Sequence, residues 1–119
     1  MSDQLIQTAG VHLSATASSP EEAVRLCGHK LLELGAVDQK YVDAMWEREQ
    51  AFSSAIGFGL AIPHGTDQAR EWVTFDQLVF IRFEKPIDWQ GEEVKMCVGI
   101  AAQGDNHMDI LGNLAELIQ

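Results

Sequence analysis

Apolar residues recur along this chain with two different periods, and each period predicts a different secondary structure. Residues 1–17 alternate weakly between apolar and polar positions, which is typical of a strand and its approach. Residues 77–83 and 94–102 are mostly apolar runs, so we predict that they form buried strands. Helical patterns separate these strands. The alternation predicts the α/β class, with a mostly buried sheet.

The first predicted helix carries clear signals at both ends. Ser19 can cap its N-terminus, Pro20 suits the first helical position, and Glu22 can complete a capping box. Gly35 is a good residue to end it. The apolar face of this helix repeats at helical spacing through Val24, Cys27, Leu31 and Leu34.

The remaining elements follow from shorter signals. Asp38 can cap a second helix that runs to about Gln50. We predict a short helical turn over residues 66–72, capped by its first two residues, and a turn over residues 85–91. A final helix is expected to open at Gly104–Asp105. The inward side of the second helix is predicted to carry Val42, Met45 and Trp46.

The segment Gly57–Thr66, GFGLAIPHGT, is the most informative part of the chain. An apolar run bounded by glycine and proline predicts a buried strand with an abrupt end. Pro63 restricts its own φ, and Gly65 allows a sharp turn, so the His64 imidazole would lie at a strand end between rigid neighbours. Open α/β sheets bind ligands at such ends. A single histidine after a proline is more often only a turn residue, so other features must support a function.

A second histidine and an arginine supply that support. His107 follows Asp105 in the first turn of the final predicted helix, where unpaired N–H groups and the helix dipole favour anions. Like His64, it follows a predicted buried strand. If the two strands are neighbours, the two imidazoles share one cleft. Arg48 is a candidate guanidinium for the same anion, although an arginine in such a charged helical stretch more often faces solvent.

Composition narrows the classes of partner and compartment. The 119 residues suit one domain, and eight basic against eighteen acidic residues give a net charge of −10. The sequence shows no basic patch of the kind that binds nucleic acid. The acidic surface serves either to attract a basic protein partner or simply to keep the protein soluble. No apolar run approaches the roughly 20 residues of a membrane helix, and we see no secretory signal. Cys27 and Cys97 are expected to be small core residues in a cytoplasmic protein.

A pair of neighbouring histidines can support more than one kind of chemistry. Zinc sites need three or four ligands with close local pairs, and no HxH, HxxxH or CxxC pair is present. The GxSxG motif of serine hydrolases and the Walker motif of ATP-binding proteins are also missing. Phosphoryl transfer onto a histidine remains, because neutral imidazole is a good nucleophile near pH 7. Such transfer needs alignment and charge neutralisation, and we expect no metal or cofactor.

Two blocks together carry a family resemblance. EREQAFSSAIGFGLAIPHGT, residues 47–66, and VGIAAQGDNHMDILGNLAEL, residues 98–117, resemble enzyme IIA of the fructose/mannitol class. These proteins are components of the phosphoenolpyruvate-dependent sugar phosphotransferase system. The resemblance runs through nearly the whole chain, and it implies a single mixed β-sheet flanked by α-helices on both faces. It is specific, because both blocks occur in the family's order.

The resemblance implies a role for each part of the site. His64 would be phosphorylated on Nε2 by the histidine phosphocarrier protein, and the group would pass to a cysteine of enzyme IIB and then to a mannitol- or fructose-type sugar entering through the membrane component, enzyme IIC. His107 would stabilise the phosphoryl group. The family's phosphate-binding positions match Arg48, Gly65, Thr66 and Asn106.

The chain departs from the family pattern at two places. The residue before the second histidine is usually glutamate, where this chain has Asn106, which softens the electrostatics around His107. The family also continues further, so we expect residues 1–119 to be a single domain of this type without its C-terminal helical tail. The alternative function is a regulatory phosphorylation-state sensor of the nitrogen-related or transcription-regulator type. A further alternative is an α/β domain whose histidines are incidental.

Overall fold

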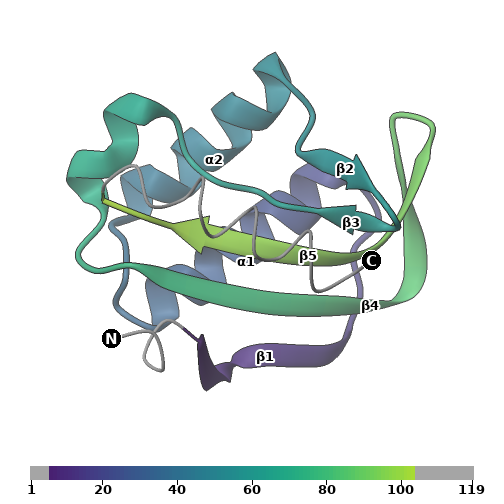
Figure 1. Ribbon diagram of the computed structural model, residues 1–119, viewed down its shortest axis with the longest axis horizontal. Helices are drawn as coiled ribbons and strands as arrows, with labels where there is room; N and C mark the ends of the chain where they lie inside the picture. The colour runs from purple at the N-terminus through teal and green to yellow at the C-terminus, as the bar shows by residue number, and fades with distance from the viewer. Residues whose placement is uncertain (1–5, 104–119) are drawn as a thin grey trace.

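A single mixed sheet organises the chain, as Figure 1 shows for the computed structural model, which describes residues 6–103. The strand order is β1-β4-β5-β3-β2, with β1 pairing parallel to β4 and β3 parallel to β5. The β4–β5 and β2–β3 pairs are antiparallel. The elements in chain order are β1 (Ile6–Ala15), α1 (Pro20–Glu33), α2 (Gln39–Ala51), β2 (Ala55–Gly57), β3 (Leu60–Ala61), the 3₁₀ helix η2 (Asp67–Trp72), β4 (Gln77–Trp89) and β5 (Glu92–Ala101).

Strand alternation divides the buried side chains between the two sheet faces. Val79 and Ile81 of β4 pack with Val24, Cys27 and Leu31 of α1 in the larger core, and both α-helices of residues 6–103 lie on that face (Figure 1). The opposite face carries a second cluster, made of Leu60, Ile62, Leu78, Val98, Ile100 and Ala102. The predicted α/β class with one mixed sheet is confirmed. The final helix expected from Gly104–Asp105 lies outside the described residues, so a helix on the second face stays a prediction.

The capping box at the N-terminus of α1 uses Ser18 as well as Ser19, where the sequence predicted Ser19 alone. Ser19 Oγ accepts the Glu22 N–H at 3.2 Å, as expected. The Glu22 carboxylate, however, accepts from the N–H and hydroxyl of Ser18, at 3.2 and 3.0 Å, and not from the Ser19 N–H. The hydroxyl of Ser18 offers a second donor, which the predicted box lacked. At the other end Gly35 adopts a φ of 81°, the left-handed C-terminal conformation that its position predicted.

Two predicted boundaries in the sheet were wrong. The strand expected to run into His64 is a short hairpin, whose second strand β3 ends at Ala61. The turn expected at residues 85–91 is mostly strand, because β4 continues to Trp89 and only Gln90–Gly91 reverses the chain. The proline at position 86 is tolerated because it lies where the β4–β5 register shifts, so its missing N–H breaks no regular ladder.

The two cysteines confirm their predicted role in the core. Cys27 and Cys97 are both free and fully buried. Burial, with the neighbouring Cys27 thiol as a hydrogen-bond partner, raises the pKa of the Cys97 thiol well above its usual range. Within residues 6–103, no helix is both long and apolar enough to cross a membrane.

The β2–β3 hairpin holds a bulky side chain in an unfavourable backbone conformation. Phe58 and Gly59 form its two-residue turn with φ values of 59° and 76°, and two positive values define a type I′ turn. Such turns favour asparagine or glycine, and Phe58 is 75% exposed, so its ring contributes little packing. We therefore expect Phe58→Asn to raise the free energy of unfolding by about 1 kcal/mol, measured by urea denaturation.

The control for this prediction is Phe58→Ala. Alanine also removes the ring but does not tolerate the left-handed conformation as asparagine does. It should therefore leave the urea midpoint nearly unchanged. Equal midpoints for the asparagine and alanine variants would show that backbone strain is not the cause.

Candidate functional site

His64 lies just beyond β3, where the chain makes its last contact with β5. It forms an isolated parallel bridge with Ile100, and the Ile100 N–H donates to the Pro63 carbonyl at 2.9 Å. The imidazole Nδ1 lies 2.9 Å from the carbonyl oxygen of Ile62. A carbonyl only accepts hydrogen bonds, so Nδ1 carries the hydrogen and Nε2 carries the lone pair. The local backbone thereby leaves Nε2 as the ring nitrogen that is available to act as a nucleophile.

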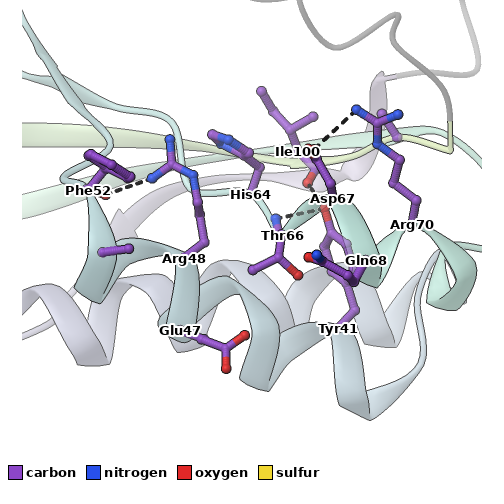
Figure 2. Close-up of a pocket in the computed structure, with 13 residues that line it drawn as sticks. Tyr41, Glu47, Arg48, Phe52, His64, Thr66, Asp67, Gln68, Arg70 and Ile100 are labelled. Atoms are coloured by element: carbon purple, nitrogen blue, oxygen red, sulfur yellow. Dashed lines mark hydrogen bonds and ion pairs between the residues drawn. The ribbon is translucent and has the colours of Figure 1, made fainter.

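A cavity of about 400 Å³ surrounds this histidine. Arg48 of α2 and Phe52 at its C-terminal cap belong to one wall, and residues of η2, including Arg70, form the other. Figure 2 shows the half-buried His64 ring between the guanidinium groups of Arg48 and Arg70. Glu47 and Asp67 also line the cavity, and the two arginines supply the donors that an anionic group bound against the imidazole would need.

The structure brings Arg48 to the site, as predicted. Its Nη1 donates to the Phe52 carbonyl at 2.7 Å, and the guanidinium lies 5.6 Å from the centre of the Phe52 ring. The carbonyl belongs to the C-terminal cap of α2, so the helix end itself orients the arginine. Because a guanidinium carries five N–H donors, this bond leaves donors that can contact an anion.

Sequence reasoning missed Arg70. It lies on η2 and pairs with Asp67, with 3.3 Å between Nη2 and Oδ1. Thr66 occupies the N-cap position of η2, as predicted, but its side chain makes no capping hydrogen bond; the helical turn itself is confirmed over Asp67–Trp72. The signal that could have identified Arg70 is its place in this turn, directly after the IPHG segment. Because η2 follows His64 so closely in the chain, a side chain on this turn can reach the cavity around the histidine.

The loop after His64 is held by Tyr41, a second residue that sequence reasoning missed. The Gly65 N–H donates to the Tyr41 hydroxyl at 2.9 Å, and this hydroxyl donates to the Ile100 carbonyl at 2.8 Å. A Cβ atom on Gly65 would lie 2.6 Å from Cε1 of the Tyr41 ring. Gly65 is therefore required by the close approach of this ring. Gly65 and Thr66 both line the cavity, and their role in phosphate binding stays a prediction.

Burial changes the acidity of Tyr41. Its side chain is 3% exposed, and burial raises its pKa from 10.0 to about 12, although the Gly65 N–H and the Arg70 charge lower it in part. Tyr41 is the chain's only tyrosine, so its ultraviolet absorbance titrates without interference. We expect that titration to give a pKa near 12 in the folded protein and near 10 in urea. A folded-state value near 10 would contradict the buried geometry.

The same shift gives a stability prediction with a defined sign. Between pH 10 and 12 the unfolded chain loses the tyrosine proton while the folded chain keeps it. Tyr41 therefore contributes fully to the free energy of unfolding below pH 10. This contribution falls by about 3 kcal/mol in total as the pH rises through 12. Tyr41→Phe should remove this pH dependence.

Two predicted site residues, His107 and Asn106, lie outside the described residues. The condition for a shared cleft is met, because β3 and β5 are parallel neighbours and His64 pairs with Ile100 near the end of β5. The placement of His107 beside His64 stays a prediction.

The fold and the site define an α/β protein with a half-buried histidine in a cavity that two arginines line. The model of the family described as phosphoenolpyruvate-dependent sugar phosphotransferase system, EIIA 2, matches residues 4–119, so the chain belongs to this family. It is thus a phosphotransferase component of that system.

Relatives of known name support the assignment. The mannitol-specific phosphotransferase enzyme IIA component of Halalkalibacterium halodurans is 43% identical over 115 residues, which cover 97% of this chain and 79% of the relative. Its counterpart in Staphylococcus aureus is 39% identical over 94% of this chain and 78% of the relative. The mannitol-specific EIICBA component of Vibrio cholerae is 35% identical, over 95% of this chain and 18% of the relative.

Solved structures agree with the fold. The complex of enzyme IIA and phosphorylated enzyme IIB for mannitol from Escherichia coli matches with a TM-score of 0.89 and 27% identity, over 94% of this chain and 81% of that chain. The crystal structure of the mannitol IIA of Escherichia coli gives 0.87 and 28%, over 92% and 80%. The nitrogen regulatory protein IIA-Ntr of Neisseria meningitidis gives 0.70 at 19% identity, over 96% and 79%, which shows the fold alone.

Proposed function

We propose that this chain is a cytoplasmic phosphocarrier that accepts a phosphoryl group on His64 Nε2 from the histidine phosphocarrier protein. It passes the group to a cysteine of an enzyme IIB partner. Relatives named as mannitol-specific enzyme IIA components support mannitol or a fructose-type sugar as the end point. The solved complex of a similar enzyme IIA with enzyme IIB supports the acceptor, and the EIICBA relative supports cooperation with a membrane enzyme IIC.

The observation that carries the proposal is the hydrogen bond from His64 Nδ1 to the Ile62 carbonyl. With Nδ1 protonated, Nε2 attacks the phosphorus of the donor's phosphohistidine. A P–N bond forms to Nε2 as the donor's P–N bond breaks, and its electron pair returns to the donor imidazole. The Ile62 carbonyl stabilises the positive charge that the His64 ring acquires, so no proton needs to move at His64.

Onward transfer reverses these changes at the ring. A cysteine thiolate of enzyme IIB attacks the same phosphorus. An S–P bond forms as the bond to Nε2 breaks, and the electron pair returns to Nε2. Because phosphoryl transfer depends mainly on alignment and charge neutralisation, the site needs no further covalent help.

The remaining site residues have proposed roles around this atom. Arg48 and Arg70 neutralise the phosphoryl oxygens from the two walls of the cavity. The backbone and side chain after the histidine, at Gly65 and Thr66, contact the same group. The roles proposed from the family for His107 and Asn106 are to stabilise and to bind it.

The test is phosphorylation by a reconstituted system of phosphoenolpyruvate, enzyme I and the phosphocarrier protein. We expect one acid-labile phosphoryl group by intact mass, and peptide mapping should place it on His64. Addition of enzyme IIB should remove it, and a mannitol-type enzyme IIB should do so faster than a fructose-type one. A folded chain that takes no phosphate would contradict the proposal. A chain that takes phosphate but gives none to either enzyme IIB would instead indicate the alternative function, a regulatory phosphorylation-state sensor.

A further inference from the structure

The parallel bridge beside His64 is interrupted by a side chain. In a regular parallel ladder, the two backbone groups of Ile100 would bond to the two residues that flank His64. One of these bonds is present, from the Ile100 N–H to the Pro63 carbonyl at 2.9 Å. In place of the second, the Tyr41 hydroxyl accepts the Gly65 N–H at 2.9 Å and donates to the Ile100 carbonyl at 2.8 Å. The hydroxyl is therefore inserted into the ladder at the reactive histidine.

This insertion couples His64 to α2. Tyr41 and Arg48 lie about two turns apart on this helix, so both project toward the same cavity, as Figure 2 shows. Arg48 is oriented by the end of the helix, and Tyr41 holds the loop that carries His64. The same rigid helix thus sets both the position of the cation and the position of the nucleophile.

The chemistry of the bridge requires a neutral phenol. Only a hydroxyl that keeps its hydrogen can accept from Gly65 and donate to Ile100 at the same time. A tyrosine with an ordinary pKa near 10 is already in this form at physiological pH, and burial, which raises the pKa of Tyr41 to about 12, extends the neutral range. A phenylalanine would fill the same volume but would leave the buried Ile100 carbonyl and the Gly65 N–H without this partner.

We infer that Tyr41 is a positioning residue for phosphoryl transfer, whose hydroxyl holds the Pro63–Gly65 segment against Ile100 and so places His64 Nε2 relative to Arg48. Tyr41 is 3% exposed, so it acts from beneath the histidine and does not contact a docked protein. The kinetic part of this inference rests on the proposed function. The placement of the His64 ring can be measured in the unphosphorylated chain, so this part of the inference does not depend on the proposed function.

The test compares Tyr41→Phe with Val42→Ala in the unmodified chain and in the reconstituted system. Val42 is the next residue on α2, is fully buried against Gly28, and has no contact with the cavity, so its variant reproduces the loss of stability only. Nitrogen NMR of the His64 ring reports which nitrogen carries the hydrogen. We expect Tyr41→Phe to lower the fraction protonated on Nδ1, and Val42→Ala to match the wild type.

Kinetics supply the second readout. A misplaced nucleophile reduces the rate of the chemical step, so we expect Tyr41→Phe to lower kcat by about tenfold or more, with the KM for the phosphocarrier protein unchanged. Val42→Ala should keep the wild-type kcat. If Tyr41→Phe does not fold, incorporation of fluorotyrosine at this single tyrosine keeps the hydroxyl but weakens it as an acceptor. The fraction of His64 protonated on Nδ1 and kcat should then both fall, but by less than is expected for Tyr41→Phe.

The outcomes separate this inference from the proposed function. A wild-type ring spectrum and kcat in Tyr41→Phe would overturn it, as would changes equal to those in Val42→Ala. A rise in KM alone would assign Tyr41 to partner binding and overturn it as well. If the wild type takes no phosphate, the proposed function fails, and the ring spectrum still decides whether Tyr41 positions His64.

Discussion

His64→Gln is expected to abolish phosphorylation of this chain, with at least about a thousandfold loss in labelling rate. Glutamine has nearly the length of histidine and can still hydrogen-bond within the segment, so the fold should survive. Its amide nitrogen has no available lone pair, however, and cannot attack phosphorus. Intact mass after incubation with phosphoenolpyruvate, enzyme I and the phosphocarrier protein measures the loss directly.

His29→Gln is the matched control for this experiment. His29 is exposed on α1 and is not among the residues that line the His64 cavity. The same chemical change there should leave both rate and extent of labelling at the wild-type level. Wild-type labelling of His64→Gln would show that another residue is the nucleophile.

Glu49→Ala is expected to lower the free energy of unfolding by about 3 kcal/mol. Glu49 is 3% exposed, and its Oε2 accepts hydrogen bonds from Trp89 Nε1 at 2.8 Å and from the Ser54 N–H at 2.9 Å. Truncation leaves both buried donors without their acceptor and opens a cavity beside the Trp89 indole. Urea denaturation followed by tryptophan fluorescence measures the change.

Glu47→Ala, on the same helix, is the control. Glu47 is exposed, so its removal should change the free energy of unfolding by less than about 0.5 kcal/mol. If the two variants were equally stable, the buried carboxylate would have no structural role.

The position of Glu49 also supports the site. It holds the Ser54 N–H, the Ser54 carbonyl accepts the Ile62 N–H at 3.0 Å, and the Ile62 carbonyl accepts from His64 Nδ1. A buried carboxylate therefore stabilises the backbone that selects the tautomer of His64. We expect Glu49→Ala to slow labelling as well as destabilise the fold.

Local signals explain what could be predicted from the sequence. Ser19 and Asp38 accept hydrogen bonds from N–H groups two or three residues further on, so their caps depend only on nearby residues. Pro63 and Gly65 likewise predicted that the chain turns away from the sheet near His64, although β3 itself ends earlier, at Ala61. The failure at residues 85–91 has the same origin. A proline suggests a turn, but whether the strand continues depends on its pairing with β5.

The sequence by itself thus determined the caps of α1 and α2 from side-chain chemistry within a few residues, and the α/β class from the alternation of strand and helix patterns. It indicated the candidate nucleophile through the IPHG segment together with the family resemblance. Only the tertiary structure decided which neighbouring charges are buried or directed to the site. Glu49 is buried beside Trp89, Arg48 faces the cavity, and Arg70 joins it from η2. The Tyr41 hydroxyl belongs to the same group, since its partners lie on β5 and after β3. Such contacts join residues far apart in the chain, and no local pattern encodes them.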